Sequence, residues 1–415
     1  MTAHIKVADT SMPHRLATAT ITVTDAAGAP LANTEVTLKQ ARHDFLFGNI
    51  LFDLIPWAIG ESDDEARDAR EAADWLELFN FGTLPFYWRT FEPVRGQTGT
   101  AALMAAAKRF RELGLTLKGH PLLWHTMAPK WLIGASLDQT ERLVRDRITH
   151  LVSDFAGVID IWDAINEAVI MPVFEAEANA ITPLCRTNGR LATVRLAFDT
   201  ARQANPHATL LINDFDLTSA YECLIEGVLA TGIEIDAIGL QTHMHQGYQG
   251  DDGIAARLSR FARYGLPLHL TEASLVSGHL MPPEIVDLND YQVDDWPTTE
   301  EDEARQAEEI AGFYRTLMAE PAVAAATYWG LTDRDAWLGA PTGLTRRDGS
   351  RKPAYDALHS LIKGTWWIAP THLVTDEAGR FEVTGFKGDY EISDTAGNSA
   401  SFHIRSGSPT VVAMR

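Results

Sequence analysis

The chain has 415 residues, of which 46% are apolar and 22% charged, an ordinary composition for a soluble globular protein. This length allows one large α/β barrel and a smaller domain. The 35 basic and 56 acidic residues give a formal net charge of −21, which argues against nucleic acid or an anionic membrane surface as a partner. The charge is compatible with a neutral ligand, although negative charge also aids solubility.

Two further features bear on the compartment. Cys185 and Cys223 are the only cysteines, so no disulfide framework holds the fold and a reducing compartment is tolerable. The N-terminus lacks the apolar core of a signal peptide, and no run of 18 apolar residues occurs. We therefore expect a cytoplasmic protein if the chain is complete, and a secreted or periplasmic one if a signal segment was trimmed. The sequence leaves the oligomeric state open.

The first 40 residues have the pattern of β structure. Residues 18–24 and 35–39 alternate apolar and polar side chains, and the turn-rich segment 25–30 between them is typical of a hairpin. These strands are too few to form a domain by themselves.

Residues 41–364 alternate apolar strand-like runs with amphipathic stretches, the rhythm of a parallel sheet. Helical patterns cover 101–113, 137–155, 194–205 and 300–318, among others. The eight candidate strands lie near 45–49, 79–84, 115–120, 158–163, 210–214, 235–241, 266–272 and 325–330. Eight such repeats predict an α/β fold of the (β/α)8 TIM barrel type, with catalytic groups at the C-terminal strand ends. We expect the long connection 276–299 to be an active-site loop.

Short alternating runs return after Pro370. They cover 371–374, 380–385, 389–393, 400–404 and 409–414. Because neither terminus has enough strands alone, we predict that residues 1–40 and 365–415 together form one small β-sandwich domain beside the catalytic barrel of 41–364.

Polar and aromatic side chains gather at the predicted strand ends. Two carboxylates occupy equivalent positions there, Glu167 after the fourth barrel strand and Glu272 at the end of the seventh. Paired carboxylates carry out glycoside hydrolysis, one as proton donor and the other as nucleophile or base. Aromatic faces stack on sugar rings, while Asn, Gln and His side chains bond hydroxyls. The strand ends therefore predict a carbohydrate cleft whose partner is an oligosaccharide or polysaccharide.

Six segments in the right order resemble glycoside hydrolase family 10, which consists mainly of retaining endo-β-1,4-xylanases on a (β/α)8 barrel. They are Gly-His-Pro-Leu-Leu-Trp-His (119–125), Trp-Asp-Ala-Ile-Asn-Glu-Ala (162–168), Ile-Gly-Leu-Gln-Thr-His (238–243), Leu-Thr-Glu (270–272), Trp-Gly-Leu-Thr-Asp (329–333) and Lys-Pro-Ala-Tyr (352–355). The resemblance covers about 41–364. It implies a retaining β-glycoside hydrolase that acts on xylan-like substrates and needs no cofactor or metal.

The resemblance also assigns roles to residues. It implies that Glu167 is the acid/base and Glu272 the nucleophile, that Asn166 holds the sugar 2-hydroxyl, and that His243 bonds the nucleophile. His125 and Gln241 would line the same subsite, with Trp329 and Trp337 as its aromatic floor and wall. The full set of candidate substrate contacts is Asn166, His120, Trp124, His125, Gln241, His243, Trp329, Trp337, Trp88 and Arg89.

The double-displacement mechanism makes physical demands on the two carboxylates. Glu167 must be protonated near neutral pH, which requires burial or a nearby negative charge, whereas Glu272 must stay ionised among hydrogen-bond donors. A retaining enzyme holds the two carboxyl groups about 5–5.5 Å apart, and an inverting one about 6.5–9.5 Å.

The chain departs from the family at two places. After the second barrel strand, the usual Asn-Glu-x-x-Lys-Trp stretch, which grips the next sugar, is replaced by Phe86-Tyr87-Trp88-Arg89. The usual Thr-Glu-Leu-Asp around the nucleophile is Thr-Glu-Ala-Ser at 271–274. Because a site built to bond a hydroxyl discriminates steeply, the first change predicts an altered sugar specificity.

Several alternatives remain open from the sequence. The chain could be an exo-acting or non-xylan β-glycosidase on the same scaffold, or a catalytically weakened carbohydrate-binding protein. A metal-dependent hydrolase that uses His243 and His245 is the least favoured reading, since the Glu pair already explains the site. Arg89 could pair with Glu92 or Asp53, or contact the substrate.

Overall fold

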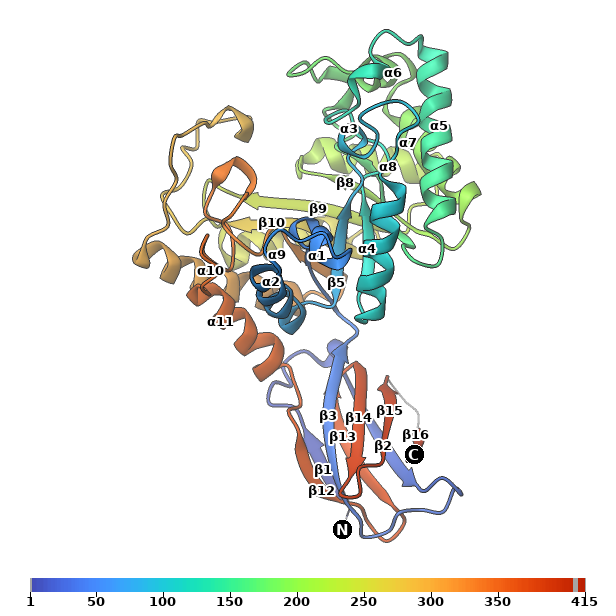
Figure 1. The fold of residues 1–415 in the computed structure, drawn as a ribbon, viewed down its shortest axis with the longest axis vertical. Coiled ribbons are helices and arrows are strands. Elements are labelled where there is room, and N and C mark those ends of the chain that lie inside the picture. Colours follow the sequence, from blue (N-terminus) through green and yellow to red (C-terminus); the bar gives the residue numbers. More distant parts are fainter. Residues whose placement is uncertain (1, 406–409, 415) are drawn as a thin grey trace. The chain divides into compact units, whose positions relative to one another are not determined.

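The computed structural model describes residues 2–405 and 410–414. Contacts within the chain divide it into two compact units, and each is described by itself. One unit comprises Phe47–Asp302 and Ala322–Ser350. The other comprises Met1–Leu46, Glu303–Pro321 and Arg351–Arg415. Both chain termini therefore belong to the second unit (Figure 1).

Eight parallel strands of the described chain close into a barrel in the order β10-β11-β4-β5-β6-β7-β8-β9 (Figure 1). The strands are β4 (Leu46–Ile50), β5 (Phe81–Pro85), β6 (Thr116–His120), β7 (Ile161–Asn166), β8 (Thr209–Asp214), β9 (Ala237–Met244), β10 (Leu268–Leu275) and β11 (Val323–Tyr328). Each overlaps one of the eight predicted runs. The predicted (β/α)8 TIM barrel is confirmed.

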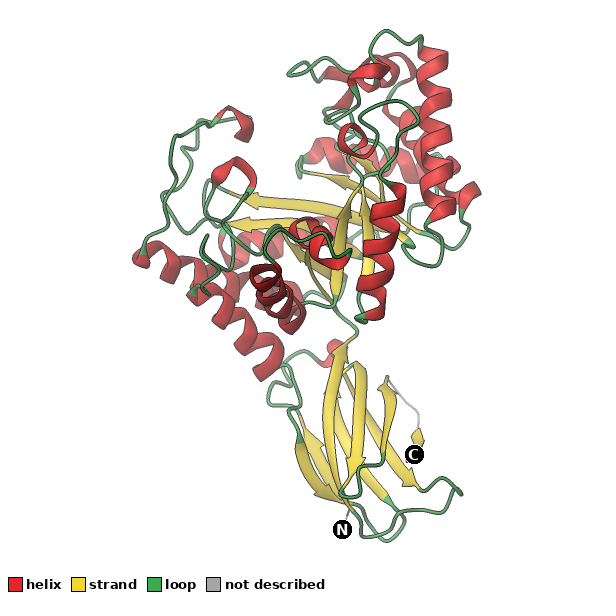
Figure 2. Cartoon of the chain, viewed as in Figure 1, coloured by secondary structure: helices red, strands yellow, loops and turns green. Residues whose placement is uncertain are grey.

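Helices follow the strands in chain order, as in a βαβα chain (Figure 2). They are α1 (Ile55–Ala58), α2 (Glu65–Leu78), α3 (Trp88–Phe91), α4 (Thr100–Glu112), α5 (Leu137–Asp154), α6 (Ile181–Asn188), α7 (Arg190–Ala204), α8 (Ser219–Ala230), α9 (Gly250–Ala262), α10 (Glu300–Ala319) and α11 (Pro353–His359). Helix α5 begins with a capping box in which Ser136 and Gln139 bond each other's backbone N–H groups. Its buried face, including Val144 and Ile148, follows the period of an amphipathic helix.

The strands that carry the site are buried along almost their whole length, as expected for a parallel barrel covered by helices. The packing of β6 against its neighbours leaves no room for an added methyl group at one position. A Cβ added at Gly119, in β6 beside His120, would lie 2.1 Å from the Trp162 ring, so only glycine fits there.

Two four-stranded sheets are built from both ends of the described chain, with orders β1-β13-β2-β16 and β12-β3-β14-β15. The strands are β1 (Ala3–Lys6), β2 (Leu16–Thr24), β3 (Glu35–His43), β12 (Thr371–Val374), β13 (Arg380–Phe386), β14 (Gly388–Asp394), β15 (Ser399–Ile404) and β16 (Thr410–Ala413). Alternate residues such as Ile21, Val383 and Ile392 are fully buried, which is the pattern of two sheets packed face to face. The predicted sandwich from both termini is confirmed, while residue 409 of its last predicted strand lies outside the described residues.

The same unit includes the end of α10. Arg15 donates to the backbone oxygens of Met318 (3.1 Å) and Glu320 (2.7 Å), which places a cation at the C-terminal end of that helix. The contacts thus group 303–321 and 351–364 with the terminal strands. The domain ranges 1–40, 41–364 and 365–415 stay a prediction.

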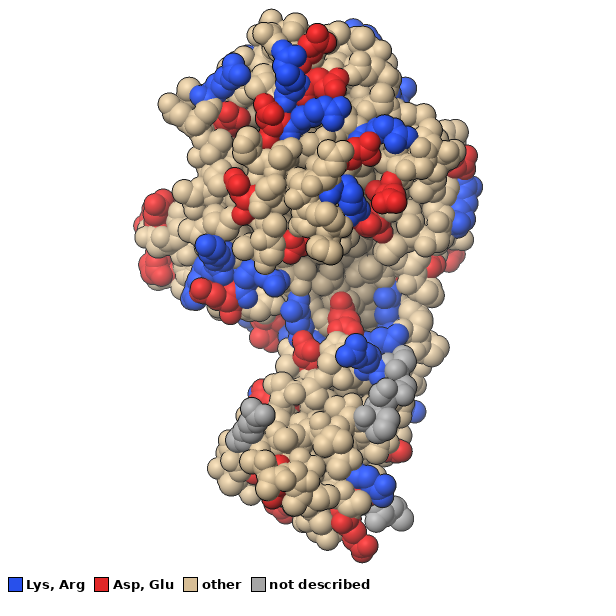
Figure 3. Space-filling model, turned by 90° about the vertical axis from the view of Figure 1, so that its right-hand side faces the viewer, with Lys and Arg blue, Asp and Glu red and all other residues tan. Residues whose placement is uncertain are grey.

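Basic and acidic side chains are interspersed on the face drawn in Figure 3, rather than gathered by sign. The net charge of −21 is thus not visible there as one acidic field. In residues 2–405 and 410–414, no helix is both long enough and apolar enough to cross a membrane.

We predict that Gly119→Ala lowers the free energy of unfolding by about 1–3 kcal/mol, because the added methyl group collides with the Trp162 ring. Urea titration followed by tryptophan fluorescence measures the change. Gly253→Ala in α9 is the matched control, since its Cβ would make only an ordinary contact at 3.5 Å with Gln249. Equal stability of the two variants would contradict the packing described for β6.

Candidate active site

The two predicted catalytic carboxylates lie at the same end of the barrel. Glu272 belongs to β10, and Glu167 is the residue directly after β7. Glu167 has a positive φ of 58°, rare for a residue with a side chain, and its N–H donates to the Asn213 oxygen at 2.8 Å. The chain therefore turns sharply at Glu167, which is a common way to aim a side chain into a site.

Neutral donors and a buried environment surround Glu167. Trp124 Nε1 donates to Oε2 at 2.7 Å, and Asn166 Nδ2 donates to Oε1 at 3.1 Å. Burial raises the pKa of Glu167 to about 8, against the effect of the Trp124 hydrogen bond. The negative charges of Asp214 and Glu272 raise this pKa further. Glu167 is therefore a protonated acid at neutral pH.

Glu272 is more buried than Glu167, with 7% against 13% of its side chain exposed, and it has different neighbours. Burial acts to raise its pKa, but His120, His243 and Lys118 together hold the pKa of Glu272 below its ordinary value. His243 Nε2 lies 3.2 Å from Oε2, and His120 Nε2 lies 3.9 Å from Oε1. Glu272 is therefore an ionised carboxylate at neutral pH.

A set of side-chain amides links the two acids. Asn213 Nδ2 donates both to Glu272 Oε1 (2.9 Å) and to Asn166 Oδ1 (2.8 Å). Asn166 in turn bonds Glu167, and Gln241 Nε2 donates to Asn166 Oδ1 at 3.1 Å. Thr271 Oγ1 donates to Asn213 Oδ1 at 2.6 Å, which fixes the orientation of that amide. The amides thus hold both carboxylates through one hydrogen-bonded network.

Three buried side chains, Asp163, Lys118 and His120, lie on the Glu272 side of the site. Asp163 accepts from His120 Nδ1 at 2.7 Å and lies 2.8 Å from Lys118 Nζ, and all three side chains are almost fully buried. Burial acts to raise the pKa of Asp163, but Lys118 and His120 lower it. The ionised Asp163 therefore orients the His120 ring toward Glu272.

Aromatic rings enclose the carboxylates, as the sequence predicts for a sugar site. Trp329, directly after β11, contacts the rings of His120 (5.4 Å between centroids) and His243 (6.1 Å). Trp337 lies 4.9 Å from His243, and 37% of its surface is exposed. An exposed indole beside the carboxylates offers a stacking surface for a sugar ring.

Eight of the ten predicted substrate contacts are brought together around Glu167 and Glu272. His125 is fully buried with its Nε2 atom 3.9 Å from Glu167 Oε2, and burial lowers the pKa of His125 to about 3, so it is neutral. The eight are Asn166, His120, Trp124, His125, Gln241, His243, Trp329 and Trp337.

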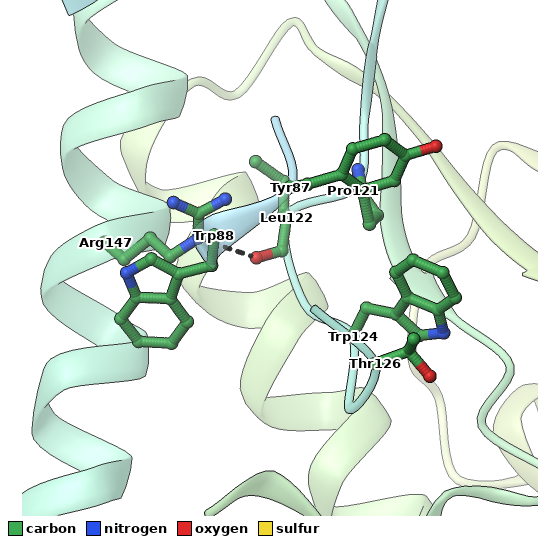
Figure 4. A pocket seen from close by; sticks show the side chains of 7 residues that line it. All are labelled: Tyr87, Trp88, Pro121, Leu122, Trp124, Thr126 and Arg147. Atoms are coloured by element: carbon green, nitrogen blue, oxygen red, sulfur yellow. Dashed lines mark hydrogen bonds between the residues drawn. The ribbon is translucent and has the colours of Figure 1, made fainter. Parts of the chain in front are cut away.

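Trp88 and Arg89 lie elsewhere. The Trp88 ring is buried beneath the Arg147 guanidinium at 4.9 Å, and its Nε1 donates to Glu92 at 2.8 Å. Arg147 also donates to the backbone oxygens of Phe86 and Leu122, so it ties together the loops after β5 and β6 (Figure 4). Trp88 therefore packs behind the loops instead of facing the carboxylates.

The ion pair expected for Arg89 with Glu92 or Asp53 is wrong, while its contact with the substrate stays a prediction. Arg89 pairs with Glu177, at 2.9 Å to each carboxylate oxygen, and not with Glu92 or Asp53. It also donates to the Ala128 oxygen at 3.1 Å, while Glu177 accepts from the Met127 N–H at 3.0 Å. Arg89 therefore holds the loops after β5, β6 and β7 to one another.

Three further side chains at the site are not among the ten predicted substrate contacts. Tyr87 contacts His120 and Trp124, Asn213 bonds Glu272, and Ser274 Oγ lies 2.8 Å from His243 Nδ1. A signal for Tyr87 was present, since in an extended segment it points opposite to its apolar neighbour Phe86, which is fully buried.

The His243 and His245 side chains have different neighbours. His243 faces Glu272 and Ser274, while the His245 ring lies 5.2 Å from Trp337 and 6.2 Å from Trp296. Among residues 2–405 and 410–414, no three His, Cys, Asp or Glu side chains are grouped to hold a metal ion.

Comparison with known protein families agrees with the barrel and its pair of carboxylates. The sequence profile of glycosyl hydrolase family 10 matches residues 86–361, which is about two thirds of the chain. The chain belongs to glycosyl hydrolase family 10. The family match includes both carboxylates and begins at Phe86, so β4 and β5 lie outside it.

Individual family members are distant. Endo-1,4-β-xylanase B of Neocallimastix patriciarum is 26% identical over 266 residues, 61% of this chain but only 28% of that protein. Endo-1,4-β-xylanase B of Thermotoga neapolitana is 26% identical over 290 residues, 66% of this chain and 78% of that protein. Xylanase 10B from Thermotoga petrophila RKU-1, solved with xylobiose, has a TM-score of 0.63 at 22% identity and covers 77% of this chain and 94% of its own. This last likeness shows the shared fold.

We predict that Asn213→Asp moves the acidic limb of the pH profile of kcat/KM upward by about one pH unit or more. A carboxylate in place of the amide that bonds Glu272 disfavours ionisation of Glu272, so Glu272 gains its proton at higher pH. In the wild type, kcat/KM should fall above about pH 8, where Glu167 loses its proton. Asn188→Asp, on the exposed end of α6, should leave both limbs in place. An unchanged acidic limb in Asn213→Asp would show that this amide does not control the ionisation of Glu272.

Proposed function

We propose that this protein is a retaining β-glycoside hydrolase that cleaves xylo-oligosaccharide-like substrates by a two-step displacement. The observation that carries the proposal is the unequal surroundings of two carboxylates at one end of the barrel, Glu167 among neutral donors and Glu272 beside His243 and His120, which shift their pKa values in opposite directions. A protonated acid beside an ionised carboxylate is the pair that this reaction needs.

In the first step, Glu167 gives its proton to the glycosidic oxygen while the Glu272 carboxylate attacks the anomeric carbon. The bond from that carbon to the leaving oxygen breaks, the alcohol departs, and a glycosyl ester forms on Glu272. Burial excludes water from both groups, which strengthens their interaction with the charge that develops on the sugar.

In the second step, Glu167 acts as a base. Once Glu272 is esterified, it no longer carries the negative charge that contributes to the raised pKa of Glu167, so the Glu167 pKa falls. The ionised Glu167 then takes a proton from a water molecule, whose oxygen attacks the anomeric carbon and releases Glu272. Both carboxylates return to their starting protonation, and the product keeps the β configuration.

The surrounding groups have supporting roles in this proposal. Asn166, anchored by Asn213 and Gln241, would hold the 2-hydroxyl of the sugar at the cleaved bond. His243 and His120 would keep the nucleophile ionised between turnovers. Trp329 and Trp337 would stack against the sugar ring.

The xylose-based substrate is proposed from the relatives named endo-1,4-β-xylanase and from the xylobiose bound to the Thermotoga petrophila enzyme. Xylohexaose with product analysis separates the modes of action. Internal cuts support endo action, release of xylose alone from chain ends would favour the exo-acting alternative, and no release would favour a binding protein.

We predict that proton NMR of a cleaved aryl β-xyloside or xylobioside detects the β-anomer first, followed by slow mutarotation. Glu272→Gln should abolish turnover, whereas Glu167→Gln should lose about 10²–10⁴-fold on substrates that need acid catalysis. The loss should shrink for a dinitrophenyl leaving group, which departs without a proton. Glu226→Gln, an exposed residue of α8, is the control and should be unaffected. The α-anomer as first product would overturn the retaining mechanism.

A further inference from the structure

Tyr87 is the side chain at the site that neither the family roles nor the proposed mechanism uses. It precedes α3, and its backbone is held from both sides. Phe86 N–H donates to the His120 oxygen at 2.6 Å, and Phe91 N–H donates to the Tyr87 oxygen at 2.8 Å. Arg147 holds the Phe86 oxygen from behind. Tyr87 is thus positioned by the barrel and by α5, which makes its ring a fixed part of the site.

Aromatic rings contact the Tyr87 ring on three sides. It meets His120 (5.6 Å) and Phe52 (5.8 Å) edge to face and lies tilted against Trp124 at 5.7 Å. Trp124 bonds Glu167, and His120 approaches Glu272, so Tyr87 packs against a direct neighbour of each carboxylate. Figure 4 shows its hydroxyl directed away from Trp88 and Arg147.

No residue in the described part of the chain accepts a hydrogen bond from the Tyr87 hydroxyl. Burial raises its pKa well above the ordinary value, and the charges of Glu272, Glu167 and Asp163 add to the rise, so the phenol stays protonated. In the described residues, the carboxylate oxygens of both acids have other partners. Glu272 is bonded by Asn213 and His243. Glu167 is bonded by Trp124, Asn166 and Gln241. A half-buried hydroxyl with no protein partner is expected to bond water or a ligand.

The position of Tyr87 indicates which part of a ligand it meets. The leaving group lies beside the acid Glu167, while the sugar that becomes attached lies over Glu272. The Tyr87 ring packs edge to face on His120, whose Nε2 atom is 3.9 Å from Glu272 Oε1. Tyr87 is therefore on the side of the sugar that stays with the enzyme.

We propose that the Tyr87 hydroxyl donates a hydrogen bond to a hydroxyl group of the sugar on the Glu272 side of the cleaved bond, and so helps to determine which sugar the enzyme accepts. This inference rests on the proposed glycoside hydrolase function. It makes Tyr87 a substrate-binding and specificity residue at the point where the sequence departs from its family.

The test is a double-mutant cycle in which the Tyr87 hydroxyl and one substrate hydroxyl are removed separately and together. Wild type and Tyr87→Phe are compared on 4-nitrophenyl β-xyloside, β-xylobioside and β-glucoside, and on deoxy analogues that lack one hydroxyl of the sugar at the cleaved bond. Tyr87→Phe should lose about 10- to 100-fold in kcat/KM on the best parent substrate, since a sugar hydroxyl is left unpaired. For one deoxy analogue the loss should vanish, because the partner is already absent.

Controls separate this role from a structural one. Tyr264→Phe removes a hydroxyl that bonds Glu226 and Arg263 near the end of α9, and it should leave kcat/KM unchanged on every substrate. Thermal unfolding of Tyr87→Phe checks that the fold is intact. Equal losses on all deoxy analogues, or no loss on any substrate, would overturn the role of Tyr87 while leaving the hydrolase function in place. No turnover of any of these glycosides or of xylohexaose by the wild type would overturn the proposed function itself.

Discussion

Two carboxylates buried at one end of a barrel repel each other if both are ionised, and the groups around them must compensate. Glu167 has uncharged donors and the acidic neighbour Asp214, whereas Glu272 has His120, His243 and Lys118 nearby. Burial alone would raise the pKa of both acids, so the placement of His120, His243 and Lys118 beside Glu272 separates the protonation of the two acids. The amide network through Asn166 and Asn213 then fixes each acid in place without adding charge.

The barrel makes this separation possible. Glu167 and Glu272 are far apart in sequence, but parallel strands bring their C-terminal ends to one face. Asn213 comes from a third strand and Gln241 from a fourth, so the network joins four neighbouring strands of the barrel, β7 to β10. Loops then enclose the face, and the ion pair of Arg89 with Glu177 joins two of them.

Much of this could be predicted from the sequence. The barrel strands were found because buried parallel strands form short apolar runs, and Glu167 and Glu272 because a carboxylate at each of two strand ends is a strong chemical pattern. The partner of Arg89 could not be found, since Glu177 lies in a loop whose path depends on tertiary packing. Trp88 was placed in the cleft because of its residue type, although burial against Arg147 takes it out of the site. Tyr87 and Asn213 were left out of the candidate contacts because their partners come from other strands of the barrel.

The residue types alone did not reveal what the changed segment after β5 does in the structure. Arg89 and Trp88 stabilise the loops, and Tyr87 is the member of the segment that faces the carboxylates. In the proposal for Tyr87, a change in sugar preference relative to the family arises from this phenol and not from the whole segment.

The central claim is that the two acids differ in protonation at neutral pH. A carbon-13 NMR titration of labelled glutamate carboxyl groups, assigned with Glu167→Gln and Glu272→Gln, measures this directly. The account predicts that Glu167 titrates near pH 8 and Glu272 below the ordinary glutamate value of 4.5. Titration of both groups below pH 5, or a higher value for Glu272 than for Glu167, would contradict it.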